Sequence, residues 1–306
     1  MELRFNVYKG EEAAVAAVLQ KLRSFLDATE PELVYFLVHT FRTQGKAITY
    51  KELREAILKG EINAELLDEW RQDYSRFVVK YLQPKWEEAM KAATDDMAAR
   101  YPDWNFDPMA DEVANWTQAH SAEFVTSVTD TQIEGLRAVV RRAAVLEDIN
   151  VDDLARAIRP LVGLYRGQAV ANLNYYNKLI ESGVKKSKAL DLANRYAARQ
   201  HRYRGYLIAR QELAMAYNTG AHEGIKQAQR AGYMGKVVKI WSTADDERRC
   251  KICGGLEGAI VDMDEEFNIQ NRPKGYKFTK LHPPAHYMCR CTVLYKEIAP
   301  PERAKY

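Results

Sequence analysis

The sequence predicts a mainly α-helical protein, in which a bundle-like body of long helices is followed by a small β-rich module at the C-terminal end. Three observations support this prediction. Apolar residues recur at helical spacing through most of the first 232 residues, strand-like runs are confined to the remainder, and all four cysteines lie between positions 250 and 291. With 47% hydrophobic and 28% charged residues, the 306-residue chain has the composition of a globular protein that buries a core.

The first two predicted helices begin at capping boxes. Residues 29–32 have the sequence Thr-Glu-Pro-Glu, with proline in the first helical turn, and apolar residues then repeat at helical spacing as far as Phe41. Residues 49–52 form a second capping box. Its helix is predicted to end at Gly60, because glycine readily takes the left-handed backbone angles that close a helix.

The following segments predict more helix, separated by proline-containing breaks. Residues 66–100 form a long amphipathic stretch interrupted at Pro84, and residues 101–108 contain two prolines, which indicates a linker. The later helix signals are an N-cap at Asp107 followed by Pro108, starts at Thr129 and Asn150, and a helix over residues 187–205. Long helices joined by short connections favour an antiparallel bundle.

The character of the chain changes after Gly232. Strand-like runs occur at residues 237–241, 259–261 and 292–295, and the segments between them, 245–249 and 268–280, are polar and rich in turn residues. Few of these residues are apolar enough to form an independent core, which favours a module held by a metal. We therefore expect three regions: an N-terminal helical region at 1–105, a helical body at 106–232, and a C-terminal module at 233–306.

The cysteines have the spacing of a metal site. Cys250 and Cys253 form one pair with a two-residue gap, and His286 and Cys289 form a second pair with the same gap. Thiolates and imidazoles that converge on one tetrahedral point are the ligands of structural zinc. Cys291 is a fifth candidate, because on a strand it lies on the same side as Cys289, so either could complete the set. The alternative is four reduced thiols without a metal, which the repeated spacing beside a histidine disfavours.

The number of candidate donors bears on what the metal does. Four or five protein ligands leave no open position on a zinc ion, and a closed site is structural because a catalytic zinc needs a free place for water. His282 is expected to be a loop histidine rather than a ligand. The sequence therefore predicts a C-terminal zinc-binding module with a structural ion.

The surroundings implied by the sequence favour thiolates over disulfides. No apolar run approaches the roughly 18 residues that a membrane-spanning helix needs, so no membrane is expected. Residues 1–5 lack the pattern of a signal peptide. We therefore expect synthesis in a reducing cytoplasm, where cysteines bind metals rather than pair. The net charge of +3 does not by itself indicate a nucleic-acid partner.

A basic, tyrosine-rich helix is the second candidate site. Arg195, Arg199 and Arg202 are spaced i, i+4 and i+7 and share one helix face, with Tyr203 and Arg204 beside them. Basic residues interleaved with aromatic residues can bind phosphates and stack on bases, so these five residues are the candidate DNA contacts. A solvated helix face with half-buried tyrosines is the slightly favoured alternative, because no nucleic-acid-binding fold signature accompanies the pattern.

A stripe of small residues follows on the same helix. Glu212, Ala216, Gly220 and Gly224 repeat every four positions, a pattern that lets another helix approach closely, so we expect core packing. Arg210 lies two residues before Glu212; the two do not face each other and are expected to pair with other elements. Because nothing resembles a nucleophile elbow, a phosphate loop or a paired-carboxylate site, we expect no enzymatic turnover.

A series of motifs extends from residue 209 to residue 292. In order, they are Ala209-Arg210-Gln211-Glu212, Ala216-Tyr217-Asn218-Thr219-Gly220, Glu223-Gly224, Trp241-Ser242-Thr243, residues 245–253 ending in Cys250-x-x-Cys253, Leu256-Glu257-Gly258, and Pro283-Pro284-Ala285-His286-x-x-Cys289-Arg290-Cys291. Together they resemble the phage head morphogenesis family, the Mu F-like minor head proteins of tailed phages. Two departures remove no ligand: Tyr287 follows His286 where the family usually has proline, and an extra arginine precedes Cys250.

The resemblance implies a virion component present in few copies. Such proteins associate with the portal protein during procapsid assembly, in company with capsid or scaffold protein, and some contact the packaged double-stranded DNA and influence its delivery. The implied location is the capsid interior or the portal vertex, after synthesis in the host bacterial cytoplasm. The first two hundred residues resemble the family only in being helical.

Two other functions stay open from the residues. Some zinc-bracketed nucleases also pair Cys-x-x-Cys turns around a histidine, but they need a histidine base and an Asn or His near a second, open metal; His282, Asp245 or Asp246, and the distant Asn271 would have to serve. A non-enzymatic DNA-binding protein that uses the helix from Arg195 to Arg210 is the third hypothesis. DNA cleavage with magnesium distinguishes the nuclease, and salt-dependent DNA retention distinguishes the DNA-binding protein.

Overall fold

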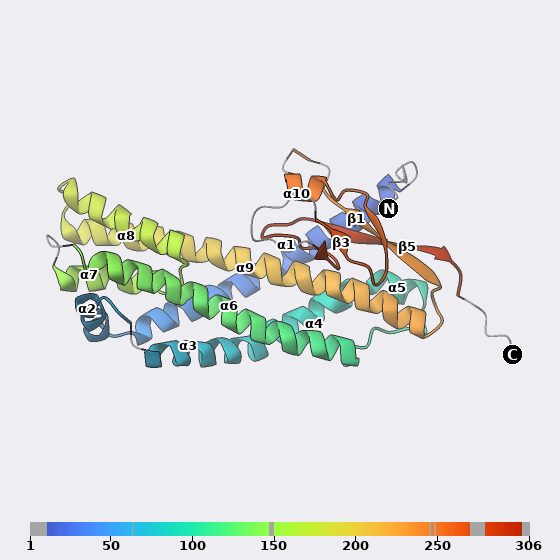
Figure 1. Ribbon diagram of the computed structural model, residues 1–306, viewed down its shortest axis with the longest axis horizontal. Helices are drawn as coiled ribbons and strands as arrows, with labels where there is room; N and C mark the ends of the chain where they lie inside the picture. The colour runs from blue at the N-terminus through green and yellow to red at the C-terminus, as the bar shows by residue number, and fades with distance from the viewer. Residues whose placement is uncertain are drawn as a thin grey trace. The chain divides into compact units, whose positions relative to one another are not determined.

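The described chain is mainly α-helical, and its few strands are short, antiparallel and near the C-terminal end (Figure 1). The computed structural model describes residues 11–62, 64–146, 150–244, 246–247, 249–269 and 279–301. Three helices are long: α1 (Glu12–Ala47), α6 (Asp111–Ala143) and α9 (Lys186–Arg230). Among the described helices, none combines the length and the apolar character that crossing a bilayer requires. The predicted fold class is confirmed.

The chain forms two compact units, each assembled from segments that are distant in sequence. Unit 1 contains Met1–Glu30, Pro84–Trp116 and Ala209–Tyr306, and unit 2 contains Pro31–Gln83 and Thr117–Ile208. Each long helix therefore contributes residues to both units. Two of the segments open with a proline, which lacks the N–H that a continuous helix would use at that position. The division into consecutive regions 1–105, 106–232 and 233–306 stays a prediction.

Unit 2 consists of helices and their connections, and its described residues contain no strand. Besides parts of the long helices it contains α2 (Tyr50–Lys59), α3 (Ala64–Phe77), the π-helix η1 (Val78–Leu82), α7 (Val151–Ile158), the 3₁₀-helix η2 (Arg159–Leu161) and α8 (Arg166–Glu181). One of its buried clusters joins apolar residues of α2, α6, α7 and α8, among them Ile57, Val139, Leu154 and Leu173. Burial of these stripes holds the helices together, because isolated helices of such lengths are marginal in water.

Local signals placed two helices of unit 2 correctly. The side chain of Thr49 accepts from the backbone N–H of Glu52, and the Glu52 carboxylate accepts from the backbone N–H of Thr49 at 2.7 Å, which is the predicted capping box. Gly60 ends α2 with a φ of 69°. Asn150 caps α7 by accepting from the backbone N–H of Asp152 at 2.8 Å.

Three predicted helix ends are wrong, because packing continues the helix through a local signal. Residues 29–32 lie inside α1, where Thr29 is buried instead of capping. Thr129 lies fully buried inside α6. The predicted end at Gly205 lies within α9, which continues to Arg230, because one interior glycine costs about 1 kcal/mol and the helix beyond it buries several apolar residues.

The break after residue 100 is present, but the next helix starts later than expected. Residues 101–110 are non-helical and α6 begins at Asp111. Asp107 holds a turn instead, since its carboxylate accepts from the backbone N–H of Met109 at 2.8 Å. Proline at 108 therefore belongs to the connection and not to the first helical turn.

The helical part of unit 1 depends on the small residues of α9. Unit 1 also contains α4 (Gln83–Ala92) and α5 (Asp95–Arg100). A Cβ added at Gly220 would lie 2.2 Å from the Cα of Met90 on α4, and one added at Gly224 would lie 2.5 Å from Thr94. The predicted close approach of another helix is therefore present, and α4 provides it.

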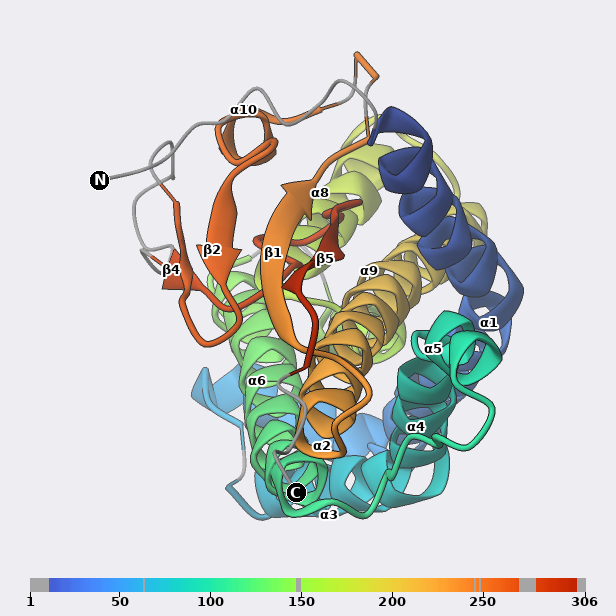
Figure 2. The same ribbon diagram turned by 90° about the vertical axis from the view of Figure 1, so that its right-hand side faces the viewer.

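A three-stranded antiparallel sheet forms the β-rich part of unit 1 (Figure 2). The central strand β1 (Lys236–Ser242) pairs with β2 (Ile260–Asp262) on one side and with β5 (Thr292–Ala299) on the other. A second pair joins β3 (Phe267–Asn268) to β4 (Thr279–Lys280). The predicted strands are thus confirmed. The rings of Trp241 and Phe267 pack edge to face, with their centroids 5.1 Å apart, in the core that contains the buried cysteines.

Candidate metal centre

The first part of the candidate metal centre is a short helical turn that begins at Cys250. Cys250 is the N-cap of α10 (Lys251–Gly254), and its Sγ accepts from the backbone N–H of Cys253 at 3.3 Å. The backbone N–H of Gly254 donates to the Cys250 carbonyl at 2.8 Å and closes the same turn. The two-residue gap therefore brings both sulfurs to one place, as the spacing predicts.

His286 and Cys289 form the second turn. The backbone N–H of Cys289 donates to the carbonyl of His286 at 3.1 Å, and Met288 between them takes left-handed backbone angles with a φ of 62°. The imidazole Nδ1 lies 2.7 Å from the carbonyl oxygen of Tyr287, so Nδ1 is the donor and Nε2 keeps its lone pair. Metal-binding histidines commonly donate their second ring nitrogen in this way.

The five candidate donors form two overlapping groups that share Cys253. One group is Cys250, Cys253 and His286, the other is Cys253, Cys289 and Cys291, and within each group the donor atoms lie within 4.8 Å of one another. The Nε2 of His286 is 3.0 Å from the Sγ of Cys250 and 3.1 Å from the Sγ of Cys253. The sulfurs of Cys253 and Cys289 are 3.7 Å apart.

Some of these distances suit one tetrahedral zinc site, but the five donor atoms are not all within 4.8 Å of one another, so the two groups would draw together around a single ion. With Zn–S bonds of about 2.3 Å, two sulfur ligands lie about 3.8 Å apart, close to the separation of Cys253 and Cys289. A sulfur and an imidazole nitrogen on the same ion lie about 3.6 Å apart, so His286 would withdraw from the sulfurs by about half an ångström. The donor set of thiols and one imidazole, without carboxylates, suits zinc rather than magnesium or calcium.

The thiols are free and mostly buried, which favours a metal over solvent as their partner. All four cysteines are unpaired, and Cys253, Cys289 and Cys291 are buried. Hydrogen bonds from the thiols of Cys253 and Cys291 hold the pKa of Cys289 well below its usual value. The thiolate, the form that binds metals, is therefore already favoured at Cys289.

An ion pair braces the two turns against each other. The guanidinium of Arg290, between two candidate ligands, binds the carboxylate of Asp246 in a bidentate arrangement, with one contact of 2.6 Å. Gly258, with a φ of 71°, donates its N–H to the carbonyl of Trp241 at 3.0 Å and turns the chain back from α10 to β2. The motif residues outside the donor set thus have structural partners.

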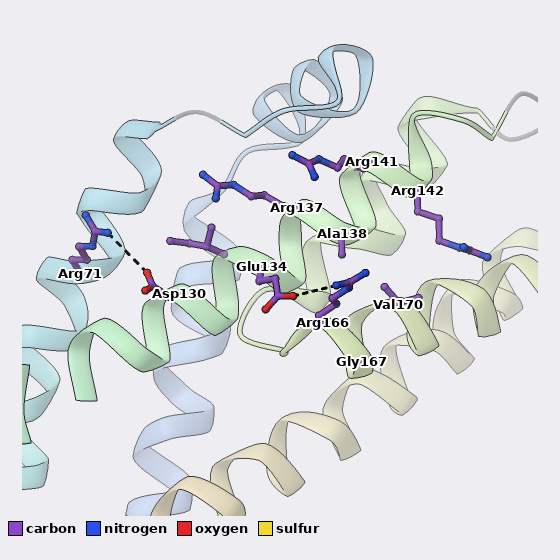
Figure 3. A pocket seen from close by; sticks show the side chains of 11 residues that line it. Arg71, Asp130, Glu134, Arg137, Ala138, Arg141, Arg142, Arg166, Gly167 and Val170 are labelled. Atoms are coloured by element: carbon purple, nitrogen blue, oxygen red, sulfur yellow. Dashed lines mark hydrogen bonds and ion pairs between the residues drawn. The ribbon is translucent and has the colours of Figure 1, made fainter. Parts of the chain in front are cut away.

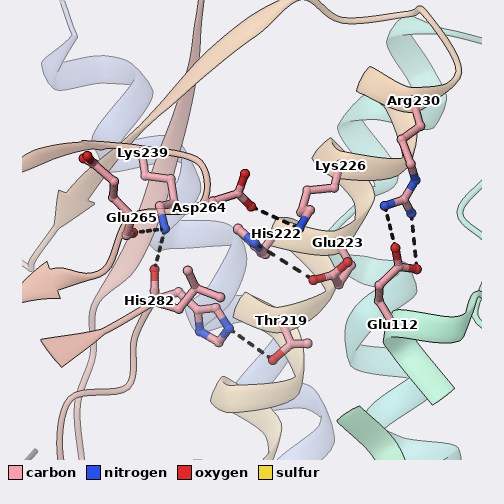
Figure 4. A network of polar contacts seen from close by, with 11 residues as sticks. Glu112, Thr219, His222, Glu223, Lys226, Arg230, Lys239, Asp264, Glu265 and His282 are labelled. Carbon is pink, nitrogen blue, oxygen red and sulfur yellow. Dashed lines mark hydrogen bonds and ion pairs between the residues drawn. The ribbon is translucent and has the colours of Figure 1, made fainter. Parts of the chain in front are cut away.

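A polar network in unit 1 connects the last turns of α9 to the β-rich module (Figure 4). The ammonium of Lys226 pairs with Asp264 at 3.1 Å, and the hydroxyl of Thr219 lies 3.3 Å from the Nε2 of His282. Thr292 on β5 donates to the side-chain oxygen of Asn218 at 2.9 Å. The pairings of this network were not predicted from the sequence, because the partners are distant along the chain.

The groups that a nuclease would need are engaged elsewhere or lie outside the described residues. His282 contacts Thr219 and the carbonyl of Pro283, and burial lowers the pKa of its imidazole to about 4. It belongs to neither donor group, in line with the expectation of a loop histidine. Asp246 pairs with Arg290. Asp245 and Asn271 lie outside the described residues.

The candidate DNA contacts on α9 divide into exposed and buried residues. Arg195, Arg199, Arg202 and Tyr203 are exposed, and the guanidinium of Arg199 stacks over a neighbouring tyrosine. Arg204 is 4% exposed and donates to the carbonyl of Gly163 at 2.6 Å, among other oxygens of unit 2. The assignment of Arg204 as a DNA contact is therefore wrong. Although it directly follows the exposed Tyr203, its guanidinium is buried and donates to backbone carbonyls of unit 2.

Comparison with known proteins identifies one family. The model of the phage Mu protein F like family matches residues 138–294, slightly more than half of the chain. The matched span contains every candidate metal ligand and the α9 face. Comparisons with curated proteins and with solved structures gave no match.

Proposed function

Because this chain belongs to the phage Mu protein F like family of head morphogenesis proteins, we propose that it is a minor head protein that associates with the portal during procapsid assembly. The family match over residues 138–294 carries this proposal. The protein would be made in the host bacterial cytoplasm and would reside in the virion, at the capsid interior or the portal vertex. Capsid or scaffold protein would be its other partners.

The proposed role is structural and involves no turnover. The metal centre supports this reading, because thiol and imidazole donors are numerous enough to fill a tetrahedral zinc ion and leave no place for water. Bound zinc would cross-link the two turns, in a module with a small apolar core.

We assign zinc to Cys250, Cys253, His286 and Cys289. These residues form the two turns of matching spacing, and the Sγ of Cys253 lies 3.7 Å from that of Cys289. Cys291 would then be a buried thiol beside the site. Elemental analysis of protein purified without chelator should give about one zinc per chain. Cys291→Ser should keep that zinc and Cys289→Ser should lose it; the opposite result would exchange the two assignments, and absence of zinc from the wild-type chain would refute the metal centre.

Entry into procapsids tests the role in the head. The chain is co-expressed with its portal and scaffold proteins, and purified procapsids are assayed for it. Cys250→Ser should enter poorly or give particles with altered DNA delivery, because the module loses its metal. Met288→Asn is the matched control: it lies between two ligands, is exposed, keeps every donor, and asparagine tolerates the left-handed backbone.

Exclusion of the full-length chain from procapsids would contradict the proposal. Exclusion together with metal-dependent DNA cleavage would establish the nuclease instead. A truncation of residues 1–120 is not a clean probe of the partner surface, because α1 supplies buried residues to both units, such as Leu26 in unit 1 and Leu37 in unit 2. Loss of entry by that truncation would report folding as much as contact.

An electrostatic contact with packaged DNA is a second candidate role for the exposed face of α9. Arg195, Arg199, Arg202 and Tyr203 support it, because they are exposed within one stretch of helix. The charge of Arg195 is partly neutralised, because its guanidinium pairs with the Asp191 carboxylate at 3.0 Å. Replacement of the three arginines by glutamine tests this role: the variant should weaken DNA binding similarly for all sequences only if this face is the main DNA contact.

A further inference from the structure

A second basic surface lies on unit 2, on helices other than α9. It is a groove of about 980 Å³ between α3, α6 and the start of α8 (Figure 3). Its described lining residues include five arginines and two carboxylates, an excess of three positive charges among them. The charged residues are Arg71, Arg137, Arg141, Arg142, Arg166, Asp130 and Glu134.

The two carboxylates are matched to two of the arginines. Glu134 lies 3.4 Å from Arg166, and Asp130 lies 3.9 Å from Arg71. Arg137, Arg141 and Arg142 are exposed, and no carboxylate of the described residues lies within ion-pairing distance of them. Within the part of the chain that the structure describes, three guanidinium groups in one groove thus have no carboxylate in ion-pairing distance.

The unpaired arginines are arranged along α6. Arg137 and Arg141 are one turn apart, a rise of about 6 Å along the helix axis, and share a face. Figure 3 shows Arg137 and Arg141 extending on one side of α6 and Arg142 extending toward α8. Several guanidinium groups that repeat along one axis suit a chain of anions better than a single small one, because each can bind two oxygens of a separate group.

The remaining lining favours a sugar–phosphate backbone over an acidic peptide. The floor is made of small or buried side chains, among them Ala138, Gly167 and Ile133, and Ile133 is only 5% exposed. A peptide would need apolar recesses for anchoring side chains, which such a floor does not offer. Among the described residues that line the groove, none has an aromatic ring on which an unpaired base could stack, which favours duplex over single-stranded nucleic acid.

We propose that this arginine groove binds the phosphodiester backbone of duplex DNA without reading its sequence. The argument uses the groove alone and depends neither on the metal centre nor on the role in the procapsid. In this proposal the main DNA contact of unit 2 is the arginine groove between α3, α6 and α8, and not the exposed arginines of α9.

Binding of a labelled duplex of mixed sequence to the full-length chain, measured by fluorescence anisotropy between about 50 and 200 mM salt, tests the assignment. Arg137→Gln combined with Arg141→Gln and Arg142→Gln should weaken binding at least about tenfold and reduce the salt slope by up to about 2.7, the value for three lost phosphate contacts. The matched control is Arg195→Gln with Arg199→Gln and Arg202→Gln, which removes the same charge from α9 and should change binding by less than about twofold.

Each other outcome overturns the proposal. Unchanged binding by the groove variant refutes the site, and equal weakening by both variants shows a general charge effect. Tighter binding of polyglutamate than of DNA to the wild-type chain identifies an acidic protein partner instead. If the groove variant does not fold, protection of Arg137 and Arg141 from an arginine-specific reagent by DNA is measured on the wild-type chain, and lack of protection counts against the groove. Exclusion from procapsids would refute the proposed function and leave this measurement intact.

Discussion

Lys239 occupies a position in β1 where a fully buried, apolar side chain would be expected. Its ammonium donates to the carbonyl of Glu265 at 2.6 Å and to the carbonyl of Leu281 at 2.9 Å, and it lies 5.4 Å from the centre of the Phe267 ring. Burial lowers the pKa of Lys239 to about 8, the cost of taking a charge out of water. The residue therefore ties two loops of the module to its central strand.

Replacement of Lys239 by methionine should destabilise unit 1. The substitution keeps the volume and removes the buried charge, but it leaves two carbonyls without their donor, at a cost of about 1–3 kcal/mol. Lys236→Met is the control on the same strand, because its ion pair with Asp262 is exposed and should be worth less than about 1 kcal/mol. Urea unfolding followed by tryptophan fluorescence compares the two; equal losses would mean that the carbonyls of the loops find other donors.

The pair of Glu30 and Arg210 predicts a dependence of stability on pH. Their side chains are 3.0 Å apart and nearly inaccessible, and desolvation raises the pKa of Glu30 to about 7 although Arg210 opposes the shift. The folded state then binds more protons than the unfolded state between about pH 4.5 and 7, so this group lowers stability as the pH rises through that range.

Glu30→Gln isolates this contribution. Its free energy of unfolding relative to wild type should increase from pH 5 to pH 8, because the wild-type chain alone loses stability on ionisation. Denaturant titrations of both proteins at the two pH values measure the difference. A constant difference would mean that Glu30 is ionised throughout, with Arg210 outweighing desolvation.

At the scale of elements, the close contact of α9 with α4 depends on Gly220, which has no side chain to hold the helices apart. Gly220→Ala would place a Cβ 2.2 Å from the backbone of Met90, so the helices must separate, at a cost of about 1–3 kcal/mol. Gly205→Ala on the same helix is the control. The added Cβ would lie 3.4 Å from the Val34 side chain, an ordinary contact distance, and alanine should add up to about 1 kcal/mol of helix stability. Opposite signs in thermal unfolding are expected; a loss of stability in both variants would contradict this account.

Elements whose signals are local could be predicted from the sequence. The cap at Thr49, the stop at Gly60 and the two turns with the candidate metal ligands each depend on residues within about one turn of one another, and the structure places all of them as expected. The stripe ending at Gly220 and Gly224 predicted a close helix contact, although not which helix would provide it.

Features that depend on distant partners could not be predicted. Glu30 resembles part of a capping box, and only its buried pairing with Arg210, 180 residues away, shows why α1 continues through it. Arg204 shares composition with its exposed neighbours, and its burial depends on carbonyls of α6 and of the connection before α8. The arginine groove likewise requires Arg71 and Arg166 to meet α6 in space.

At the scale of the whole molecule, two units with different means of stabilisation should respond differently to loss of the metal. Unit 2 has a large apolar core made by its helices and the connections between them. The β-rich part of unit 1 has a smaller core that includes Cys253, Cys289 and Cys291, and would need zinc to hold its two turns together. The end of α9 is bound to that part through Asn218 and Lys226.

Chelation under reducing conditions should therefore unfold one part of the chain and spare the other. Hydrogen exchange should become fast over residues 236–299 and faster over the last turns of α9, while residues 117–208 keep their protection because no donor lies in unit 2. Mass spectrometry of peptides from both ranges measures this, with Cys250→Ser combined with Cys253→Ser as the control that should already show the chelated pattern and change no further. If residues 117–208 lose protection together with the module, the metal stabilises the whole molecule, and the two units fold as one cooperative structure.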